Sequence, residues 1–557
     1  MALKPPVTDL NIKVSKDGFY EGFSKGTTVG SKIIIIGLVL WAAVFPEQAG
    51  ALLLKIRGWS FESFGPWYIY AMAFVVFLCL VLAVFPSIGK VRLGGVDAKP
   101  EFSRFSWFSM MFGAGIGIGM LTFSTAEPIY HFASNPDTII GAVAPESAET
   151  LRSVYKWSFF HWGLTAWSCY GIVGLALAFF SYNRNLPLTI RSGLTPFFGR
   201  KMEGVAGDLV DISAVIATIL GIAVTIGYGI TQFASGLSII TGADWMLNSE
   251  GAPTNSAMLL GLGVIMAASI LSAASGVRKG IKWLSNINMV LSFALLAFFL
   301  VFGSPFVAIQ SFFVGIADYI VNFPVQAMTY WANSNVEPAA TLYKWQSVWW
   351  TVFYWAWWIA FAPFVGLFFA RISRGRTIRE YVLGTMILPS IMCFIWFTVV
   401  GGTAIDLELT GKAGGAILSA GQEAQLFATL KVMVGSGLFK LLTFMVAILL
   451  MTYLVTSADS GILILNTILS GGDEGQKAKR HIIFWGSAVT IVITVLLLAG
   501  GLGAIKSAML LGALPFSAIM VLMGLALIKA LARDAMRLKK GEELVKPEVR
   551  KLDDQPA

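Results

Sequence analysis

The chain has 557 residues, of which 56% are hydrophobic and 13% are charged, and its formal net charge at pH 7 is +9. This composition excludes a soluble globular protein of such length and predicts a protein that crosses the membrane many times. Only three cysteines and three histidines occur, without metal-ligand spacing, and the basic residues lie in short loops. We therefore expect neither an enzyme, nor a cofactor, nor a nucleic-acid partner.

Twelve apolar segments are long enough to cross a bilayer, which takes about 20 residues of helix. They are 31–50, 67–87, 104–131, 154–181, 209–240, 256–275, 282–303, 345–370, 378–402, 432–468, 482–501 and 507–531. A further apolar stretch, 307–325, is interrupted by Asp318, Asn322 and Pro324. We expect this stretch to lie along the outer surface, where it suits an interface or a subunit contact.

The distribution of charge predicts the orientation. With the N-terminus inside, 31 of the 40 lysines and arginines fall on the cytoplasmic side, as the positive-inside rule requires. The first 30 residues are polar and show no cleavable signal peptide. We expect a multi-pass protein of the inner (plasma) membrane of the cell, with both termini in the cytoplasm. The basic tail then lies near the anionic inner leaflet, either as a plain anchor or as a sensor of the membrane surface.

The third span contains glycine at every second position, at Gly113, Gly115, Gly117 and Gly119. Each glycine costs a helix about 1 kcal/mol relative to alanine, so the helix can loosen here. Irregular backbone within a bilayer is tolerated where it is buried or lines a wet cavity. The run therefore predicts either a mid-membrane site with freed carbonyls and amides, or close packing of helices.

The fourth span carries Trp162, Trp167 and Tyr170 near its centre. In a continuous helix, steps of five and three residues turn by about 140° and then back by about 60°, so these rings share a restricted arc. Tryptophan normally favours the membrane interfaces. Rings at mid-depth fit a cage for a methylated cation, and the alternative is aromatic packing between helices.

The eighth span repeats this feature with Trp355, Trp357, Trp358 and Phe361. We expect its centre to lie at a similar depth to that of the fourth span. An aromatic cage between these two spans would hold a permanent cation by π-faces and dipoles.

Acidic side chains are not expected at the depth of the cage. Glu127 lies near the outer end of its span, while Asp211, Glu380 and Asp459 fall close to inner ends. A proton relay therefore has no obvious carrier, and coupling to a metal cation is the better hypothesis. In the tenth span, the hydroxyls of Thr456 and Ser457 could add oxygen ligands to carbonyls of the glycine run, although such hydroxyls usually bond their own backbone.

Four motifs resemble those of the betaine/carnitine/choline transporter (BCCT) family. They are GAGIGIG followed by EP in the third span, HWxxxxWxxY in the fourth, YWAWWIAFAPFVGLFFARISRGRTIRE in the eighth and TSADSG in the tenth. The resemblance runs over essentially all twelve spans. It implies an all-α, LeuT-like membrane protein in which a five-plus-five inverted repeat follows two extra N-terminal helices, and which is usually a homotrimer.

The resemblance also implies the boundaries of the parts. These are a cytoplasmic N-terminal segment (1–30), two extra helices (31–102), the first repeat (103–303), an outer interfacial helix and linker (304–344), the second repeat (345–531) and a basic cytoplasmic tail (532–557).

Carried over by position, the substrate cage of the family would be Trp162, Trp167, Tyr170 and Trp358, with the backbone of 115–119 near the anionic end of the substrate. Two departures from the family pattern concern the substrate. Phe361 stands where many members have tryptophan. Gly119 stands where choline-type members have an acid, which argues against choline and against proton coupling.

The resemblance implies a sodium site between the third and tenth spans. Its ligands would be carbonyls of Gly113, Ile116 and Tyr453 with the hydroxyls of Thr456 and Ser457.

A second sodium site would use Thr218 and Phe364. It is in doubt, because Ile222 stands where sodium-coupled betaine carriers have a further threonine.

These features together predict a sodium-driven symporter for a methylated onium compound. Glycine betaine is the first candidate, followed by trimethylamine, carnitine, choline and dimethylsulfoniopropionate. A channel or a betaine-binding membrane sensor are the alternatives of another class.

Overall fold

The computed structural model describes residues 5–115, 117–275, 278–475 and 478–545, and no β-strand occurs in these ranges. The α-helices are α1 (Lys25–Val44), α2 (Pro46–Val84), α3 (Pro86–Gly89), α4 (Arg104–Gly115), α5 (Gly117–Ala133), α6 (Pro136–Ile139), α7 (Thr150–Trp162), α8 (Leu164–Tyr182), α9 (Thr195–Phe198), α10 (Val205–Thr241), α11 (Asn255–Ser275), α12 (Arg278–Phe302), α13 (Pro305–Met328), α14 (Ala339–Tyr343), α15 (Thr351–Ile372), α16 (Ile378–Trp396), α17 (Gly402–Leu409), α18 (Gln425–Met433), α19 (Ser436–Leu469) and α20 (Lys479–Lys539). Three short 3₁₀ turns, η1 (Ile190–Leu194), η2 (Gly199–Glu203) and η3 (Asp244–Met246), and two π-helical turns, η4 (Lys344–Trp349) and η5 (Phe397–Gly401), join them.

Eleven helical segments of the described chain are long and apolar enough to cross a membrane, against twelve expected spans. The expected third span contains α4 and α5, which lie on either side of residue 116, outside the described residues, and each is too short to count alone. The last two expected spans are the two parts of α20, on either side of a break at Gly500 and Gly501, and α13 is long and apolar enough to count as a candidate. An all-helical membrane protein is therefore confirmed, and the difference between eleven and twelve comes from these three places.

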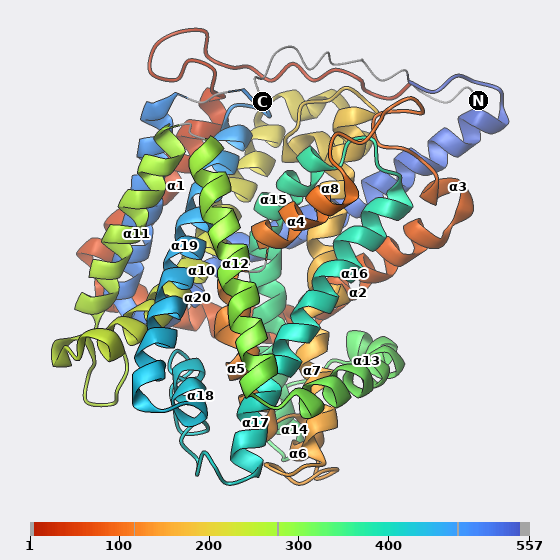
Figure 1. Ribbon diagram of the computed structural model, residues 1–557. Coiled ribbons are helices and arrows are strands. Elements are labelled where there is room, and N and C mark those ends of the chain that lie inside the picture. Colours follow the sequence, from red (N-terminus) through yellow and green to blue (C-terminus); the bar gives the residue numbers. More distant parts are fainter. Residues whose placement is uncertain (1–4, 116, 276–277, 476–477, 546–557) are drawn as a thin grey trace.

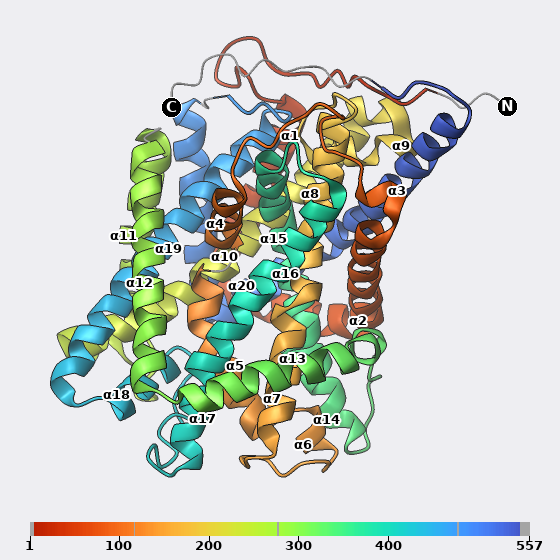
Figure 2. The ribbon, with the colours of Figure 1, turned by 45° about the vertical axis from the view of Figure 1, so that its right-hand side comes forward.

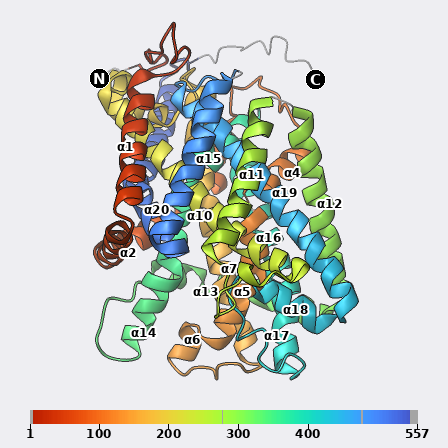
Figure 3. The same cartoon turned by 90° about the vertical axis from the view of Figure 1, so that its left-hand side faces the viewer.

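The ends of the bundle define two faces. The start of α1 and the end of α20 lie at one face, which we call the terminal face (Figure 1). The short helices α6, α14, α17 and α18 lie together at the opposite end in every view, which we call the far face (Figures 1, 2 and 3). Figure 3 also shows α1 at the edge of the bundle, and α1 packs against α10 and α20.

The helix α15 occupies the centre of the molecule. It packs against α8, α10 and α20, and only Phe368 and Arg371 of its residues are not fully buried. A helix that is apolar on all sides is stable only when other elements surround it. The tryptophan-rich motif therefore lies in the protein interior and not against lipid.

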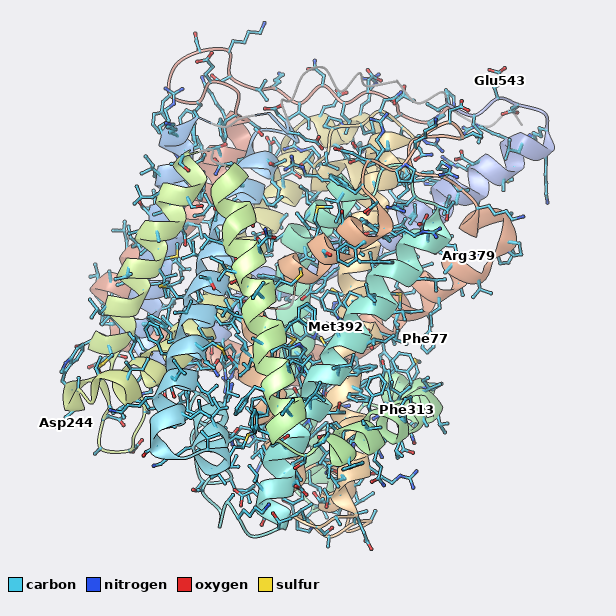
Figure 4. All side chains as sticks on the ribbon, in the orientation of Figure 1. Phe77, Asp244, Phe313, Arg379, Met392 and Glu543 are labelled. Atoms are coloured by element: carbon cyan, nitrogen blue, oxygen red, sulfur yellow. The ribbon has the colours of Figure 1, made fainter. Side chains whose placement is uncertain are left out.

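The helix α13 has the opposite character. It runs across the direction of the long helices (Figure 2). Phe306 is 87% exposed and Val321 76% exposed, and Phe313 lies at the edge of the molecule (Figure 4). These exposed apolar side chains agree with the predicted surface helix.

The 61-residue helix α20 is interrupted at Gly500 and Gly501. Gly501 has φ of 61°, a left-handed conformation that glycine adopts without a steric penalty. Close to the break, the start of α2 packs through Gly50 against the carbonyl of Ala499. Because α2 begins toward the far face, the break in α20 lies near that face as well.

Ion pairs fasten the loops at the terminal face. The buried Arg191 guanidinium contacts Asp208 and Asp211, both at 2.6 Å, and so ties η1 to the start of α10. Arg184 pairs with Asp534 near the end of α20. Such partly buried pairs fix geometry because removing one partner leaves a buried charge.

Candidate functional site

The fourth span is not one continuous helix. It breaks at Gly163, where φ is −94° and ψ is −141°, so that α7 ends at Trp162 and α8 begins at Leu164. A side chain at Gly163 would overlap the carbonyl of Phe159 and lie within 2.9 Å of Phe394 and Tyr319. The helical arc expected for the aromatic residues is therefore wrong, since it assumes an unbroken helix.

Two indole rings satisfy carbonyls that the break exposes. The Trp167 Nε1–H donates to the carbonyl of Trp162 at 3.0 Å. The Trp358 Nε1–H, from α15, donates to the carbonyl of His161 at 3.1 Å. A helix end buried without hydrogen-bond partners would be unfavourable. These two indoles therefore stabilise the end of α7 at the break.

The four aromatic residues of the expected cage form what we call the ring cluster: Trp162, Trp167, Tyr170 and Trp358. Trp162 and Trp358 have ring centroids 5.0 Å apart at 73°. Tyr170 meets Trp358 at 6.3 Å and Trp167 at 5.6 Å, both edge to face. Each of the four side chains is at most 5% exposed. The structure therefore gathers α7, α8 and α15 around one set of π-faces.

The other aromatic candidates lie around the ring cluster to different degrees. Trp357 stacks on Trp358 at 4.9 Å, and Phe361 meets Tyr170 at 6.4 Å. Trp355 packs against Phe160 at 5.2 Å, and the structure records no ring contact between Trp355 and the ring cluster among the described residues.

Three further aromatic rings contact Trp162 and were not anticipated. They are Tyr354, Phe123 and Phe397, at centroid distances of 5.6, 5.7 and 5.2 Å. Tyr354 lies one helical turn before Trp358, so the spacing in the eighth span could have shown it. Phe123 and Phe397 come from α5 and η5, and no periodicity within the fourth or eighth span could reveal them.

The buried side chain of Glu127 joins the ring cluster, contrary to the expectation of an acid-free site. Trp162 Nε1–H and the Tyr354 hydroxyl donate to its Oε2 at 2.5 and 2.6 Å. Its position near the outer end of a straight third span was inferred by counting residues. In the structure Glu127 of α5 contacts Trp162 of α7 and Tyr354 of α15, so that count did not give its depth relative to Trp162.

Two of the supposedly scattered histidines meet the same carboxylate. Oε1 of Glu127 lies 2.6 Å from His161 Nδ1 and 3.2 Å from His131 Nε2. His161 Nε2 also lies 3.0 Å from the hydroxyl of Thr351. The three groups lie within 4.8 Å of one another, an arrangement that could hold a metal ion. Here each carboxylate oxygen already has two polar neighbours, so Glu127 works as a hydrogen-bonded hub.

The glycine run packs closely where the structure describes it. A side chain at Gly117 would overlap the ring of Tyr453, and one at Gly119 would lie 2.9 Å from Trp162. Gly113 and Gly115 lie in α4, while Ile116 falls outside the described residues. Close packing, the simpler of the two readings, therefore accounts for Gly117 and Gly119.

Three of the five proposed ligands of the first sodium site, Tyr453, Thr456 and Ser457, lie on α19. The Tyr453 hydroxyl lies 2.9 Å from that of Ser292, and Asn288 Nδ2 lies 3.3 Å from Thr456 Oγ1. The Thr456 hydroxyl itself donates to the carbonyl of Thr452 at 3.0 Å. Ser457 lies on the same helix, one residue beyond Thr456.

The second pair, Thr218 and Phe364, occupies neighbouring helices. Gly221 of α10 packs against Ala360 of α15, and these helices run antiparallel. Thr218 and Phe364 are therefore each about one turn from that contact, on the same side. The Thr218 hydroxyl is buried with no hydrogen-bond partner among the described residues, whereas Ile222 packs against Gly461.

A cavity of about 400 Å³ lies beside the ring cluster, toward the far face. Phe123 and Tyr354 line it and also contact Trp162. Its lining includes Trp349, which is 50% exposed, and Tyr130, which is 37% exposed. We call it the far-face cavity.

A profile of the betaine/carnitine/choline family of transporters matches residues 27–536. The chain belongs to this family. It is therefore a transporter and not an enzyme, and the resemblance seen in the four motifs is confirmed.

Three relatives show the range of this family. The glycine betaine transporter OpuD of Bacillus subtilis is 38% identical over 92% of this chain and 96% of its own length. The betaine/ectoine transporter LcoP of Corynebacterium glutamicum is 34% identical over 96% of this chain and 81% of its own. The high-affinity choline transport protein of Escherichia coli K12 is 36% identical over 89% of this chain and 70% of its own.

Proposed function

We propose that this BCCT transporter imports a methylated onium compound, glycine betaine first, in symport with sodium. The single observation that supports this most is the ring cluster, in which Trp162 and Trp358 meet at 5.0 Å in a buried site. The relatives named for glycine betaine point to the same class of substrate.

Recognition would rest on cation–π attraction. Each aromatic face contributes about 0.5–2 kcal/mol, so four faces at the upper value supply about 8 kcal/mol, close to micromolar affinity before ordering costs. Glu127 adds to this, because a carboxylate that accepts the Trp162 N–H polarises the indole and places negative charge nearby. The Glu127 hub thus favours a cation without touching it.

The candidate onium compounds belong to one chemical class. Trimethylamine, carnitine, choline and dimethylsulfoniopropionate all present methyl groups on a positive centre. The relative named for choline supports a second onium compound as a substrate of the family, and the relative named for betaine and ectoine supports a zwitterionic substrate. Gly119 in direct packing with Trp162 leaves no room for the acid expected in choline-type members, which favours betaine over choline.

Sodium would be the co-transported ion. The residues on α19 offer hydroxyl and carbonyl oxygens, which suit a hard cation. At the second site, the unpartnered buried hydroxyl of Thr218 is consistent with an oxygen ligand. Each co-transported charge contributes about 2.3 kcal/mol per 100 mV of membrane potential, enough to drive accumulation.

The proposal extends to architecture and placement. The chain would form a five-plus-five inverted repeat in a homotrimer in the inner (plasma) membrane, with the terminal face in the cytoplasm. The exposed apolar residues of α13 suit lipid or a neighbouring subunit. The basic tail would then lie against the anionic inner leaflet.

Uptake into proteoliposomes tests the proposal. We expect saturable uptake of labelled glycine betaine that depends on an inward sodium gradient, and competition by other onium compounds in a ranked panel. Uptake that does not depend on the sodium gradient would contradict the proposed coupling to sodium. Non-saturable flux would indicate a channel, and binding without counterflow would indicate a sensor.

A further inference from the structure

The far-face cavity is a candidate binding site in its own right. Its volume of about 400 Å³ falls in the range of small-ligand sites. Its wall is aromatic, with Tyr228 and Phe353 beside Phe123 and Tyr354, the two rings that contact Trp162. A small organic ion could therefore lie there before reaching Trp162.

Two cationic side chains line this cavity. They are Arg57 from α2 and Lys506 from α20. Lys506 Nζ lies 4.8 Å from the ring centroid of Tyr228 and 5.1 Å from that of Phe353, which fixes its position. Because both side chains line one cavity, an anion bound in it would be near both positive charges.

Neither cation is neutralised. Among the described residues that line the cavity none is acidic, and no ion pair involves Arg57 or Lys506 in that part of the chain. Two other basic residues outside the terminal face do have acidic partners: Arg152 pairs with Asp318 and Lys156 with Asp137. Both side chains are partly buried, and two like charges that line one cavity repel each other, so an anion between them is favourable.

The charge changes sign across one aromatic wall. The Tyr354 ring lines the cavity, while its hydroxyl donates to Glu127 on the other side at 2.6 Å. Positive charge therefore lies on the cavity side and negative charge behind the wall. A molecule with a cationic end and an anionic end would align its cation toward Glu127 and its anion toward Arg57 and Lys506.

We propose that the far-face cavity is an entry site for carboxylate-bearing onium compounds, in which Lys506 and Arg57 hold the carboxylate. Onium alcohols such as choline lack that group and gain nothing from these cations. The onium part of this inference rests on the proposed function, whereas the carboxylate part does not.

Chemical modification of Lys506 tests the carboxylate site without transport. Detergent-purified protein is treated with an amine-acetylating reagent, and the modification of each lysine is followed by mass spectrometry. Sodium acetate, glycine betaine, choline chloride and sodium chloride are compared at equal concentration and ionic strength. We expect acetate and glycine betaine to slow modification of Lys506 several-fold, and choline and chloride to leave it unchanged.

Lys412 is the matched control, because it is exposed in the turn after α17 at the far face. Its modification rate should not respond to any of the four compounds. Equal protection of Lys506 by choline and betaine, protection of Lys412 as strong as that of Lys506, or no protection by acetate would overturn the carboxylate site.

Uptake by variants tests the selectivity. Lys506→Met keeps the contact with the two rings but removes the charge, and should raise the KM for glycine betaine about 10-fold while leaving competition by choline unchanged. Lys506→Arg should restore the betaine KM, and Lys412→Met should not alter it. An unchanged betaine KM in Lys506→Met would contradict the inference while leaving the proposed function intact. If no onium compound is transported, the proposed function fails, and protection of Lys506 by acetate still decides the carboxylate site.

Discussion

The ring cluster and the far-face cavity lie next to each other, with Phe123 and Tyr354 between them, but they differ in charge and in burial. The ring cluster is buried, its indoles donate to backbone carbonyls or to Glu127, and its neighbouring charge is negative. The cavity extends to half-exposed residues and carries two unpaired cations within the described chain. The difference indicates that one region selects the onium head and that the other acts on a distant anionic group.

Replacing Trp358 should give the largest loss of onium uptake. Trp358→Leu removes a π-face of the ring cluster and the donor to the His161 carbonyl, so we expect onium uptake to fall ~100-fold. Proteoliposome uptake of glycine betaine, with protein amount matched, measures this. Trp245→Leu is the control, because Trp245 lies in η3, is 54% exposed and sits beside Asp244, which is labelled at the opposite edge of the molecule from Phe313 (Figure 4). Normal uptake by Trp358→Leu would remove the ring cluster from the mechanism.

Neutralising Glu127 should give the second-largest loss of uptake. Glu127→Gln replaces a charged acceptor of the Trp162 and Tyr354 hydrogen bonds by a neutral one, at a cost of about 1.5–3 kcal/mol. We expect uptake of every onium compound to fall about 30-fold and thermal stability to decrease. Glu250→Gln, at an exposed position in a loop, is the control. An unaltered affinity for onium compounds would show that the negative charge behind the wall does not act on the substrate.

The break beneath the ring cluster can be tested by stability. Gly163→Ala adds a methyl group that meets Phe394 and Tyr319 at 2.9 Å, and such overpacking costs about 1–3 kcal/mol. Thermal unfolding of purified protein should shift down by several degrees. Gly204→Ala is a matched control, because Gly204 has similar φ and ψ of −105° and −152° but nothing within 4 Å. Equal shifts in both variants would assign the effect to backbone conformation and not to the packing around the ring cluster.

The smallest loss of uptake should come from changing Tyr354, which lies between the ring cluster and the far-face cavity. Tyr354→Phe keeps the ring in both regions and removes only the hydroxyl that donates to Glu127, worth about 1 kcal/mol. We expect uptake of betaine and choline-type compounds to fall about 5-fold and to the same extent. Competition assays with both compounds measure this. A loss confined to betaine would indicate that Tyr354 acts on the carboxylate and would blur the distinction between the two regions.

Much of the site followed from the sequence, and the rest depended on contacts between helices. The composition predicted a multi-pass helical protein, and the motif residues Trp162, Trp167, Tyr170 and Trp358 do come together. The helical arc was wrong because Gly163 breaks the fourth span, a change that spacing alone does not show.

The acid was missed for a related reason. Glu127 was placed by counting along one straight helix, while its neighbours come from α7 and α15. One signal did exist, since an ionisable residue inside a membrane span is a functional candidate by default, and both Glu127 and His161 met that description. Phe123 and Phe397 carried no such signal, because ordinary aromatic residues are common in membrane helices.

The break in α20 has a consequence for mapping which side of the membrane each face occupies. The chain reverses at Gly500 and Gly501 without a polar loop, and the Ala499 carbonyl is already covered by α2. A reporter enzyme or epitope tag inserted there would separate packed helices and move Lys506. Failure to detect the reporter or tag would therefore not show which side of the membrane this part of the chain occupies. The turn around Gly411, with φ of 71° and nothing packed against it, offers a place at the far face where an inserted tag can report which side of the membrane that face occupies without disturbing the fold.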